Sequence, residues 1–508
     1  MKSMKKWITL LLAAAMLTGM TACGDTETGT TETTPAETTD TSLQTDAAET
    51  DPAERDDLPT DNKEYEGYNF TIISFDFPDA AIAWRVADIY TEELNGERIN
   101  DAVFERNLAM TDRFGVTVAQ NLINRDTVVS EVKQLITAGD DAFDLFQCNA
   151  MNQSSLAVEG YLLDMAKIDY IDFDKAWWDR SAMEGISVGG KIYHAFGDNS
   201  LNSKKSTLAV LFNKALTEKA GVPDLYTTVK EGDWTLDLLT EYAEQIAMDV
   251  NGDGARTYGD DIFGVGIEHG VAVWAFSSSG LTTFSIADDG SAVYNLNSSA
   301  ALDAMEIVNR FMTASPDFVL NAQNAPGEYN GNFVEFRKLF MSDKIGFYMG
   351  HLGTVTLVGG EMNSDFGILP FPKVFADQDE YYSTLQLNNA MTVSVPKSAS
   401  DTTRTGLLTE AYVMFSHDTV LPAYYDYTLT MRSARDEESE EMLDIIFANR
   451  IFDIGIAFSG NLASGPYKFL TDTGIAETFN YASKEASTQK SLITAFEKSL
   501  AAILEIEY

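Results

Sequence analysis

The chain has 508 residues, of which 45% are hydrophobic, enough for two to four packed domains. Its formal net charge is −43 and it contains no basic run, so nucleic acid is excluded as a partner, because neutralising phosphates requires clustered Lys and Arg.

Residues 1–22 have the pattern of a secretory signal peptide. Three lysines precede the apolar run WITLLLAAAML, which is too short to span a bilayer. The run ends in MTAC, which resembles the lipobox of bacterial lipoproteins, in which the cysteine is lipidated and becomes the new N-terminus. We therefore expect a lipid anchor at Cys23; an ordinary secretory signal is the alternative.

Residues 23–64 are predicted to be the lipidated cysteine and a disordered acidic tether. Residues 24–64 contain twelve threonines and thirteen acidic residues but almost no large aliphatic side chain. Such a segment cannot bury enough apolar surface to offset its loss of conformational entropy. Once the signal is removed, Cys148 is the only other cysteine, so no intrachain disulfide is available to the folded body.

From Tyr65 onward, strand and helix patterns alternate. Strands are predicted at 68–74, 116–120 and 143–148, and helices at 97–114 and 127–139, an order that indicates parallel βαβ units. The later pattern predicts further strands and helices, and the body is α/β throughout. The strands are expected at 206–213, 344–349, 366–371 and 390–396, and the helices at 234–249, 299–313, 403–416, 437–449 and 481–504.

The order of short sequence blocks in this body resembles the extracellular solute-binding proteins of family 1, which include maltodextrin-binding proteins. The blocks that carry the resemblance are DRFGVTV, VKQLITAGDDAFDLFQC, LAVEGYLLDM, GGKIYHAFGD, LAVLFNKALTEKAGVPD, FMSDKIGFYMGHLG, FGILPFPK and MTVSVPKSA. The resemblance implies a periplasmic-binding-protein-like fold with two discontinuous α/β lobes, a hinge and a ligand cleft between the lobes. We expect the first lobe at 65–205 and 388–452, and the second at 206–387 and 453–508.

Candidate ligand-binding residues follow from where such sheets bind ligands. Open α/β sheets bind ligands beyond the carboxyl ends of their strands, and sugars need carboxylates, amides and flat aromatic rings. Trp274, in the small-residue run WAFSSSG, is expected to form an exposed aromatic platform. The other candidates are Asp76, Trp84, Asn149, Asp198, Asn199, His351, Gln386, Asn388 and Asn389. For each of them, a capped turn or a packed core position is the alternative.

Four further observations on single positions concern the specificity of this site and the aromatic residues near it. His351 and Leu352 stand where the family often carries a stacking tryptophan, so the resemblance does not carry maltodextrin specificity over to this chain. Trp177 and Trp178 are expected to pack a surface segment, although one of them could reach the cleft.

The stretch DVNGDGARTYGDD (249–261) resembles the first half of an EF-hand calcium loop. Its expected ligands are Asp249, Asn251, Asp253, the Ala255 carbonyl, Thr257 and Asp260. A strand-like run follows it instead of an exiting helix, so we expect a structural Ca²⁺ and no sensor. The alternative is a metal-free acidic turn held by Asx-type hydrogen bonds.

Taken together, these features predict a lipid-anchored receptor. The sequence contains no HExxH or Walker motif and no GxGxxG after a strand, so no catalytic residue or catalytic cofactor is expected. We expect a monomer on the extracellular face of the membrane of a Gram-positive bacterium. It would capture a solute, most plausibly an oligosaccharide, for the permease subunits of an ABC transporter. A surface glycan-binding lipoprotein without a transporter and a cell-surface glycosidase are the alternatives.

Overall fold

The protein is described by a computed structural model that covers residues 56–60, 62–76, 87–268, 270–323, 325, 327, 333–359, 361–362, 364–430, 437–462 and 465–506.

The first sheet organises the N-terminal part of the chain. The sheet has the strand order β12-β3-β1-β2. Its strands are β1 (Asn69–Asp76), β2 (Thr117–Asn124), β3 (Leu145–Asn149) and β12 (Met391–Ser394). β1 pairs in parallel with β2 and β3, whereas β12 is antiparallel to β3.

The two helices between these strands follow the predicted pattern. α2 (Arg98–Phe114) buries Val103, Met110 and Phe114, and α3 (Val128–Ala138) buries Val128, Val132 and Ile136. Gly115 ends α2 in the left-handed conformation, with φ of 71°, and its N–H donates to the Thr111 carbonyl. The predicted parallel βαβ units are confirmed.

The second sheet has five strands in the order β10-β4-β9-β5-β8. They are β4 (Leu208–Asn213), β5 (Phe263–Ile267), β8 (Val319–Asn321), β9 (Ile345–His351) and β10 (Phe366–Leu369). β5 is parallel to β8 and β9, and β4 is antiparallel to β9 and β10. Gly264 lets α9 (Leu236–Ile246) lie directly on β5, because a Cβ there would stand 1.9 Å from the Ala243 carbonyl oxygen.

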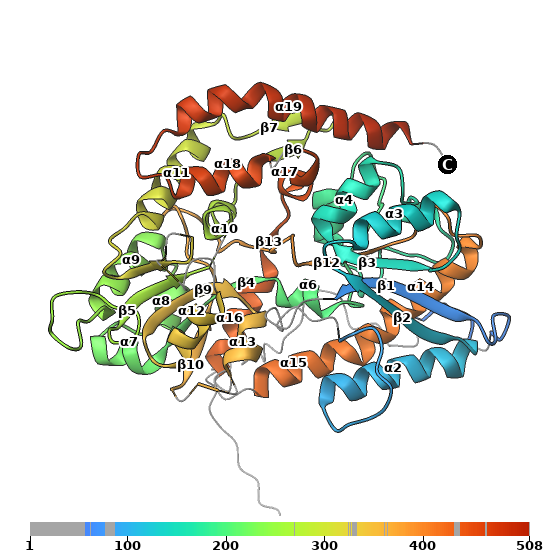
Figure 1. The fold of residues 1–508 in the computed structure, drawn as a ribbon, viewed down its shortest axis with the longest axis horizontal. Helices are drawn as coiled ribbons and strands as arrows, with labels where there is room; N and C mark the ends of the chain where they lie inside the picture. The colour runs from blue at the N-terminus through green and yellow to red at the C-terminus, as the bar shows by residue number, and fades with distance from the viewer. Residues whose placement is uncertain are drawn as a thin grey trace, which may run out of the picture. The chain divides into compact units, whose positions relative to one another are not determined.

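The remaining elements surround the two sheets or join them (Figure 1). Before β4 come α4 (Ala150–Val158), η2 (Met165–Lys167), α5 (Arg180–Ile186) and α6 (Leu201–Lys205). Between β4 and β12 lie α7 (Lys214–Ala220), α8 (Leu225–Lys230), α10 (Val271–Ser278), β6 (Phe284–Ile286), β7 (Ala292–Tyr294), α11 (Ser299–Met312), α12 (Phe333–Met341), α13 (Gly353–Val358) and β11 (Ser383–Thr384). After β12 come α14 (Thr402–Asp418), α15 (Val420–Thr430), α16 (Glu437–Ala448), β13 (Arg450–Ile451), α17 (Ile454–Ala457), η4 (Ser459–Asn461), α18 (Gly465–Gly474) and α19 (Tyr481–Glu505).

One expected boundary of the lobes differs from the packing. Residues 388–452 were assigned to the first lobe, and α14 and α15 do pack against α2. α16, however, packs against β10, and its Leu443 and Ile446 belong to a hydrophobic cluster with Leu211 and Phe366 of the second sheet. The chain therefore returns to the second lobe before β13.

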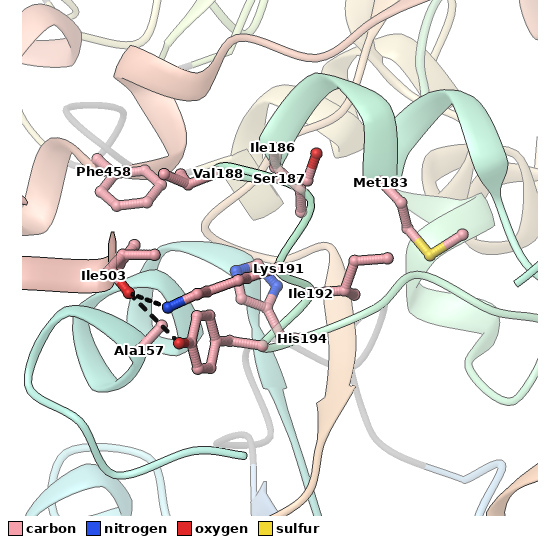
Figure 2. A pocket seen from close by; sticks show the side chains of 11 residues that line it. Ala157, Met183, Ile186, Ser187, Val188, Lys191, Ile192, His194, Phe458 and Ile503 are labelled. Carbon is pink, nitrogen blue, oxygen red and sulfur yellow. Dashed lines mark hydrogen bonds between the residues drawn. The ribbon is translucent and has the colours of Figure 1, made fainter. Parts of the chain in front are cut away.

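The C-terminal helix α19 contacts both lobes. It packs against α4 on one side and against β7, α11 and α18 on the other. Lys191 holds its end, because the Lys191 Nζ donates to the Ile503 carbonyl at 3.1 Å (Figure 2). It also donates to the carbonyls of Leu504 (3.1 Å) and Ile506 (2.8 Å). A cation at the last carbonyls of a helix stabilises it.

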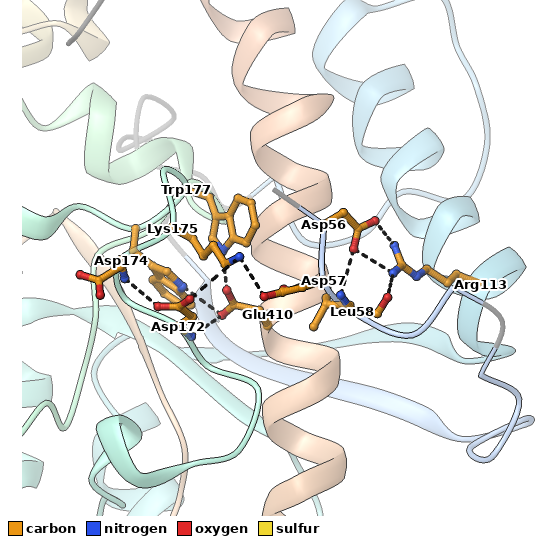
Figure 3. Close-up of polar contacts among 10 residues, drawn as sticks. Asp56, Asp57, Leu58, Arg113, Asp172, Asp174, Lys175, Trp177 and Glu410 are labelled. Atoms are coloured by element: carbon orange, nitrogen blue, oxygen red, sulfur yellow. Dashed lines mark hydrogen bonds and ion pairs between the residues drawn. The ribbon is translucent and has the colours of Figure 1, made fainter. Parts of the chain in front are cut away.

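The end of the expected tether is bound to the first lobe (Figure 3). Arg113 pairs with both carboxylate oxygens of Asp56, at 2.5 and 2.9 Å, and also donates to the Leu58 carbonyl. Lys175 pairs with Asp57 at 3.0 Å, and Leu58 is buried. The Arg113 hydrogen bonds lower the pKa of Asp56. The expectation of disorder throughout 24–64 is therefore wrong for the described residues 56–60 and 62–64, because Leu58 and the acids beside it find partners.

The rest of the N-terminal prediction lies outside the described residues, including the signal peptide, Cys23 and the tether up to residue 55. Among the helices that the structure describes, none is both long enough and apolar enough to cross a membrane.

Candidate functional site

The carboxyl ends of the central strands lead directly into short helices. β3 ends at Asn149, which starts α4 by accepting a hydrogen bond from the Asn152 N–H at 2.9 Å. β9 ends at His351, two residues before α13. α6 precedes β4 and lies between the two sheets in Figure 1. Two cavities adjoin these elements.

The first, here called the hinge cavity, has a volume of about 10 Å³, room for about one water molecule or one hydroxyl group. It lies among α4, α10, α17, α18 and the segment around β11, and three of the predicted ligand-binding residues line it: Trp274, Gln386 and Asn388. The Oε1 of Gln386 and the Oδ1 of Asn388 are buried and accept no hydrogen bond from any residue that the structure describes. Two buried acceptors without donors at one cavity are suited to a ligand that brings hydroxyl groups.

Trp274 has a different setting from the predicted one. It lies within α10, where a loop was expected, and only 2% of its surface is exposed. Its ring packs edge-on against Phe371, with centroids 6.4 Å apart. The prediction of an exposed platform is wrong, because the small residues of WAFSSSG allow the helix to pack tightly; the indole lines the hinge cavity as part of its wall.

The second, here called the cleft cavity, is open to solvent and has a volume of about 840 Å³. Residues 87–100 after β1 form one side, and α6, α13 and α15 form the others. α6 and α13 approach closely: a Cβ on Gly353 would lie 3.3 Å from the Lys205 Cβ. This volume lies within the roughly 300–1000 Å³ of ordinary small-ligand pockets, so the cavity can accommodate a small solute.

Backbone hydrogen bonds hold the start of the second lobe, directly after α6. The Gln386 N–H donates to the Ser206 carbonyl at 3.0 Å, and the Leu352 N–H donates to the Thr207 carbonyl at 2.8 Å. The segment around residues 205–208 is thus held by both neighbours of the cavities. A change in the angle between the lobes would therefore require the backbone to bend at this segment.

Asp198 and Asn199 occupy buried positions with partners of their own. One oxygen of Asp198 lies 3.1 Å from the Lys204 Nζ and the other 2.7 Å from the His417 Nδ1. Burial raises the pKa of Asp198, but the charges of Lys204 and His417 outweigh it and hold the pKa below its usual value. Asn199 donates to the Gln147 Oε1 at 3.0 Å. Both residues stabilise the crossing into the second lobe.

His351 belongs to a buried polar cluster at the end of β9. Its Nε2 lies 3.6 Å from a carboxylate oxygen of Glu268, which accepts a 2.5 Å hydrogen bond from the Tyr348 hydroxyl. Burial lowers the pKa of His351 to about 3 and raises that of Glu268. The imidazole is therefore neutral at physiological pH, so its contact with Glu268 is no salt bridge.

The other candidates are dispersed. Asp76 is exposed at the end of β1, and Asn389 is buried next to the hinge cavity. Trp84 lies outside the described residues. Trp177 and Trp178 are buried, and their indole N–H groups donate to the two oxygens of Glu410 at 2.8 and 3.0 Å (Figure 3).

Sequence reasoning missed Lys205, Tyr90 and Asp88, which all line the cleft cavity. The pair KK in LNSKKS, directly before a strand in a strongly acidic chain, is a signal that could have identified Lys205. No comparable signal marks Tyr90, because its position depends on the path of the segment after β1.

The acidic loop 249–260 closes on its own backbone. Asp249 accepts the N–H groups of Gly252 and Gly254, and Asp253 accepts that of Ala255, at 2.7–2.9 Å. Asp261, a residue that the calcium prediction omitted, is fully buried and accepts the N–H groups of Val250 and Thr257. Within the described part of the chain, no three His, Cys, Asp or Glu side chains gather as a metal site. Calcium stays a prediction, and these bonds supply the metal-free alternative.

No protein-family model and no curated protein matches this sequence. Solved structures do match it. M. tuberculosis UspC is 14% identical with a TM-score of 0.53, covering 84% of this chain and 100% of that one. An ABC substrate-binding protein from Listeria monocytogenes in complex with cycloalternan is 15% identical with a TM-score of 0.52, covering 84% and 98%. The GacH receptor of Streptomyces glaucescens, solved unliganded and with acarbose, is 13% identical with a TM-score of 0.53, covering 87% and 100%.

At such low identity, these matches speak to the fold. They cover nearly the whole length of each solved chain. The predicted fold class is confirmed: this chain has the two-lobed, periplasmic-binding-protein-like α/β fold of the ABC-transporter solute-binding proteins.

Proposed function

We propose that this protein is the solute-binding receptor of an ABC importer and that its solute is a sugar or an oligosaccharide. The observation that carries the proposal is the pair of buried acceptors in the hinge cavity, the Gln386 Oε1 and the Asn388 Oδ1, beside the indole of Trp274. Sugars present hydroxyl donors at the ring edge, and a cavity of about 10 Å³ admits one such hydroxyl, which can donate to the acceptors that have no partner.

The comparisons support the same class of ligand. The neighbours of known structure were solved with cycloalternan, acarbose and maltotetraose. They are binding proteins, and two further neighbours were solved with the polyols mannitol and ribitol. We therefore propose that this chain, too, is a receptor without catalytic activity.

The proposal includes a lipid anchor at Cys23, which would place the receptor on the extracellular face of the membrane beside its permease subunits. It rests on the signal and lipobox pattern of the sequence. Globomycin treatment of producing cells, which blocks lipoprotein signal cleavage, should cause the uncleaved precursor to accumulate. Unchanged processing would favour the ordinary secretory signal.

Calorimetry on a panel of oligosaccharides, with product analysis of each mixture, tests the function. We expect saturable binding of at least one soluble sugar, with no product released. Removing one acceptor in N388A or Q386A should weaken binding by about 3- to 10-fold, the effect of one neutral hydrogen bond. N121A removes an exposed amide of β2 and is the matched control.

Other results would each contradict the proposal in a distinct way. Released product would indicate a glycosidase. Binding to insoluble polymer in preference to short oligomers would indicate a surface glycan-binding protein without a transporter. Failure of every sugar in the panel would overturn the sugar assignment.

A further inference from the structure

We infer that the solute carries a carboxylate, as a uronic acid does, and that Lys205 in the cleft cavity binds it. This inference rests on the proposed function, since it specifies which sugars the receptor takes. It goes further by placing one charged ring of the solute between α6 and the segment 87–100.

Lys205 is a partly buried cation whose ammonium has no acceptor. It lines the cleft cavity, yet within the described residues it forms no hydrogen bond and no ion pair. An ammonium carries three donors, and those of Lys205 are available to a ligand in the cavity. Burial lowers the pKa of Lys205, and the more distant Asp88 offsets only part of this effect.

The preceding lysine shows what a structural cation looks like at this place. Lys204 lies 3.1 Å from Asp198, and the attraction of this carboxylate outweighs the effect of burial, so the pKa of Lys204 is raised. The two neighbouring lysines of α6 thus differ in one respect: Lys204 has a carboxylate from the protein and Lys205 has none.

Asp88, the carboxylate whose charge acts on Lys205, already accepts hydrogen bonds from other groups. Asp88 is 3% exposed; its Oδ2 accepts the Leu201 N–H at 2.6 Å, and its Oδ1 faces the Gln147 amide at 3.5 Å. The buried guanidinium of Arg106 lies on its other side and donates to the Asp88 carbonyl at 2.8 Å. The charges of Arg106 and Lys205 both interact with the one carboxylate of Asp88, so the three groups together carry one net positive charge.

The rest of the wall suits a sugar ring. Tyr90 lines the cavity with 38% of its surface exposed, so its ring is accessible for stacking. Thr91 and Thr356 add hydroxyl groups, and Leu201 and Leu357 add apolar surface. At the rim, Glu97 and Arg98 are both exposed and carry opposite charges. A carboxylate-bearing sugar matches a cation, an aromatic face and hydroxyls in one cavity.

The overall charge of the protein makes this local cation necessary. A net charge of −43 repels an anionic solute, and at physiological ionic strength this repulsion is screened beyond roughly 8 Å. Within the cavity, Lys205 then decides the sign of the interaction at short range.

Matched pairs of ligands test the inference. The probes are trisaccharides of galacturonate, glucuronate and mannuronate, each with its methyl ester, which keeps the ring and removes the charge, and the neutral galactose, glucose and mannose trisaccharides. A sulfated and a phosphorylated sugar serve to distinguish a carboxylate from other anions. We expect at least one uronate to bind about 10- to 100-fold more tightly than its ester, because a charge-assisted hydrogen bond is lost, and this preference should shrink at high salt.

Three variants assign the effect to Lys205. K205M should remove the preference for the acid over the ester, and K205R should retain most of it, whereas K167M, at an exposed lysine of the first lobe, should change nothing. K205M should also melt at the same temperature as the wild type or higher without ligand, since it removes an uncompensated cation. A lower melting temperature would show that Lys205 has a structural role and would overturn the inference.

The failure of this inference and that of the proposed function can be distinguished. If neutral sugars bind and uronates do not, Lys205 is not a carboxylate site, although the receptor function stands. If sulfated or phosphorylated sugars bind best, the assignment to a carboxylate is wrong. If no saccharide binds, charged or neutral, the proposed function fails first.

Discussion

Arg106 provides a direct test of what fixes the wall of the cleft cavity at residues 88 and 89. Its side chain is fully buried, and its guanidinium lies 4.2 Å from the ring centroid of Tyr412. Nη1 donates to the carbonyl of Asp88 at 2.8 Å and Nη2 to the carbonyl of Ile89 at 2.7 Å. A further bond, from Nη1 to the Ser416 hydroxyl at 3.1 Å, joins this pair to α14. One side chain thus fixes the start of the segment that forms the cavity wall.

Replacing Arg106 by methionine keeps the apolar stem but removes the guanidinium bonds to both carbonyls. Asp88 then keeps only the Tyr412 hydroxyl at 3.4 Å, and Ile89 keeps only the Asn107 amide at 3.1 Å. Each lost hydrogen bond costs about 0.5–1.5 kcal/mol, and the lost stacking on Tyr412 adds about 1 kcal/mol, so we expect a destabilisation of about 2–4 kcal/mol. R106K keeps the charge but cannot span both carbonyls with the geometry of a fork, and it should lie between R106M and the wild type.

Urea unfolding monitored by tryptophan fluorescence measures the cost, and calorimetry of the bound solute reports the state of the cavity wall. R310M is the control, because Arg310 forms an exposed pair with Asp237 at 2.7 Å that is worth less than about 1 kcal/mol. If R106M shifted the unfolding midpoint no more than R310M does, the fork would not hold the segment, and the reasoning would be refuted.

Four further predictions concern other parts of the molecule. Burial raises the pKa of Glu410 to about 7, above its unfolded value near 4.5. The folded state therefore binds one more proton than the unfolded state between these two pH values, and stability falls as the pH rises from about 4.5 to about 7. Melting curves should show E410Q gaining on the wild type by up to about 3 kcal/mol over this range, and parallel curves would refute this. K191M should free the last carbonyls of α19 and speed hydrogen exchange in residues 495–506 several-fold, with exchange in β1 as the internal reference. R113M should release the segment at Leu58 to limited proteolysis without changing solute affinity, which Edman sequencing of the fragments would show. Calcium at millimolar concentration should raise the melting temperature while leaving ligand specificity unchanged if the loop 249–260 binds it, whereas no shift would assign the loop to its own Asx-type bonds.

Much of the fold was predictable because its elements are regular in sequence. The apolar period of 97–114 and the glycine after it define α2, and the same logic defines α3. α10 was missed, because WAFSSSG carries no helical period: every residue of this helix is buried, so no polar face marks it.

The candidate site was predictable only in outline. Gln386, Asn388 and Trp274 do meet at one cavity, although Trp274 precedes the other two by more than a hundred residues in the chain. Asp198, by contrast, has the right residue type and the right loop, but Lys204 and His417 occupy its carboxylate. A sequence shows which groups could bind a ligand, whereas their partners depend on segments that only folding brings close.

The sequence by itself determined the α/β alternation, the parallel pairing of β1 with its neighbours and the acidic character of the chain, since these depend on local period and composition. Only the tertiary structure decided that Leu58 packs on the first lobe, that α16 returns to the second sheet and that Lys204 finds a carboxylate whereas Lys205 does not. Adjacent residues of one type share their sequence context, but the cost of a buried charge is set by what the rest of the chain places beside it.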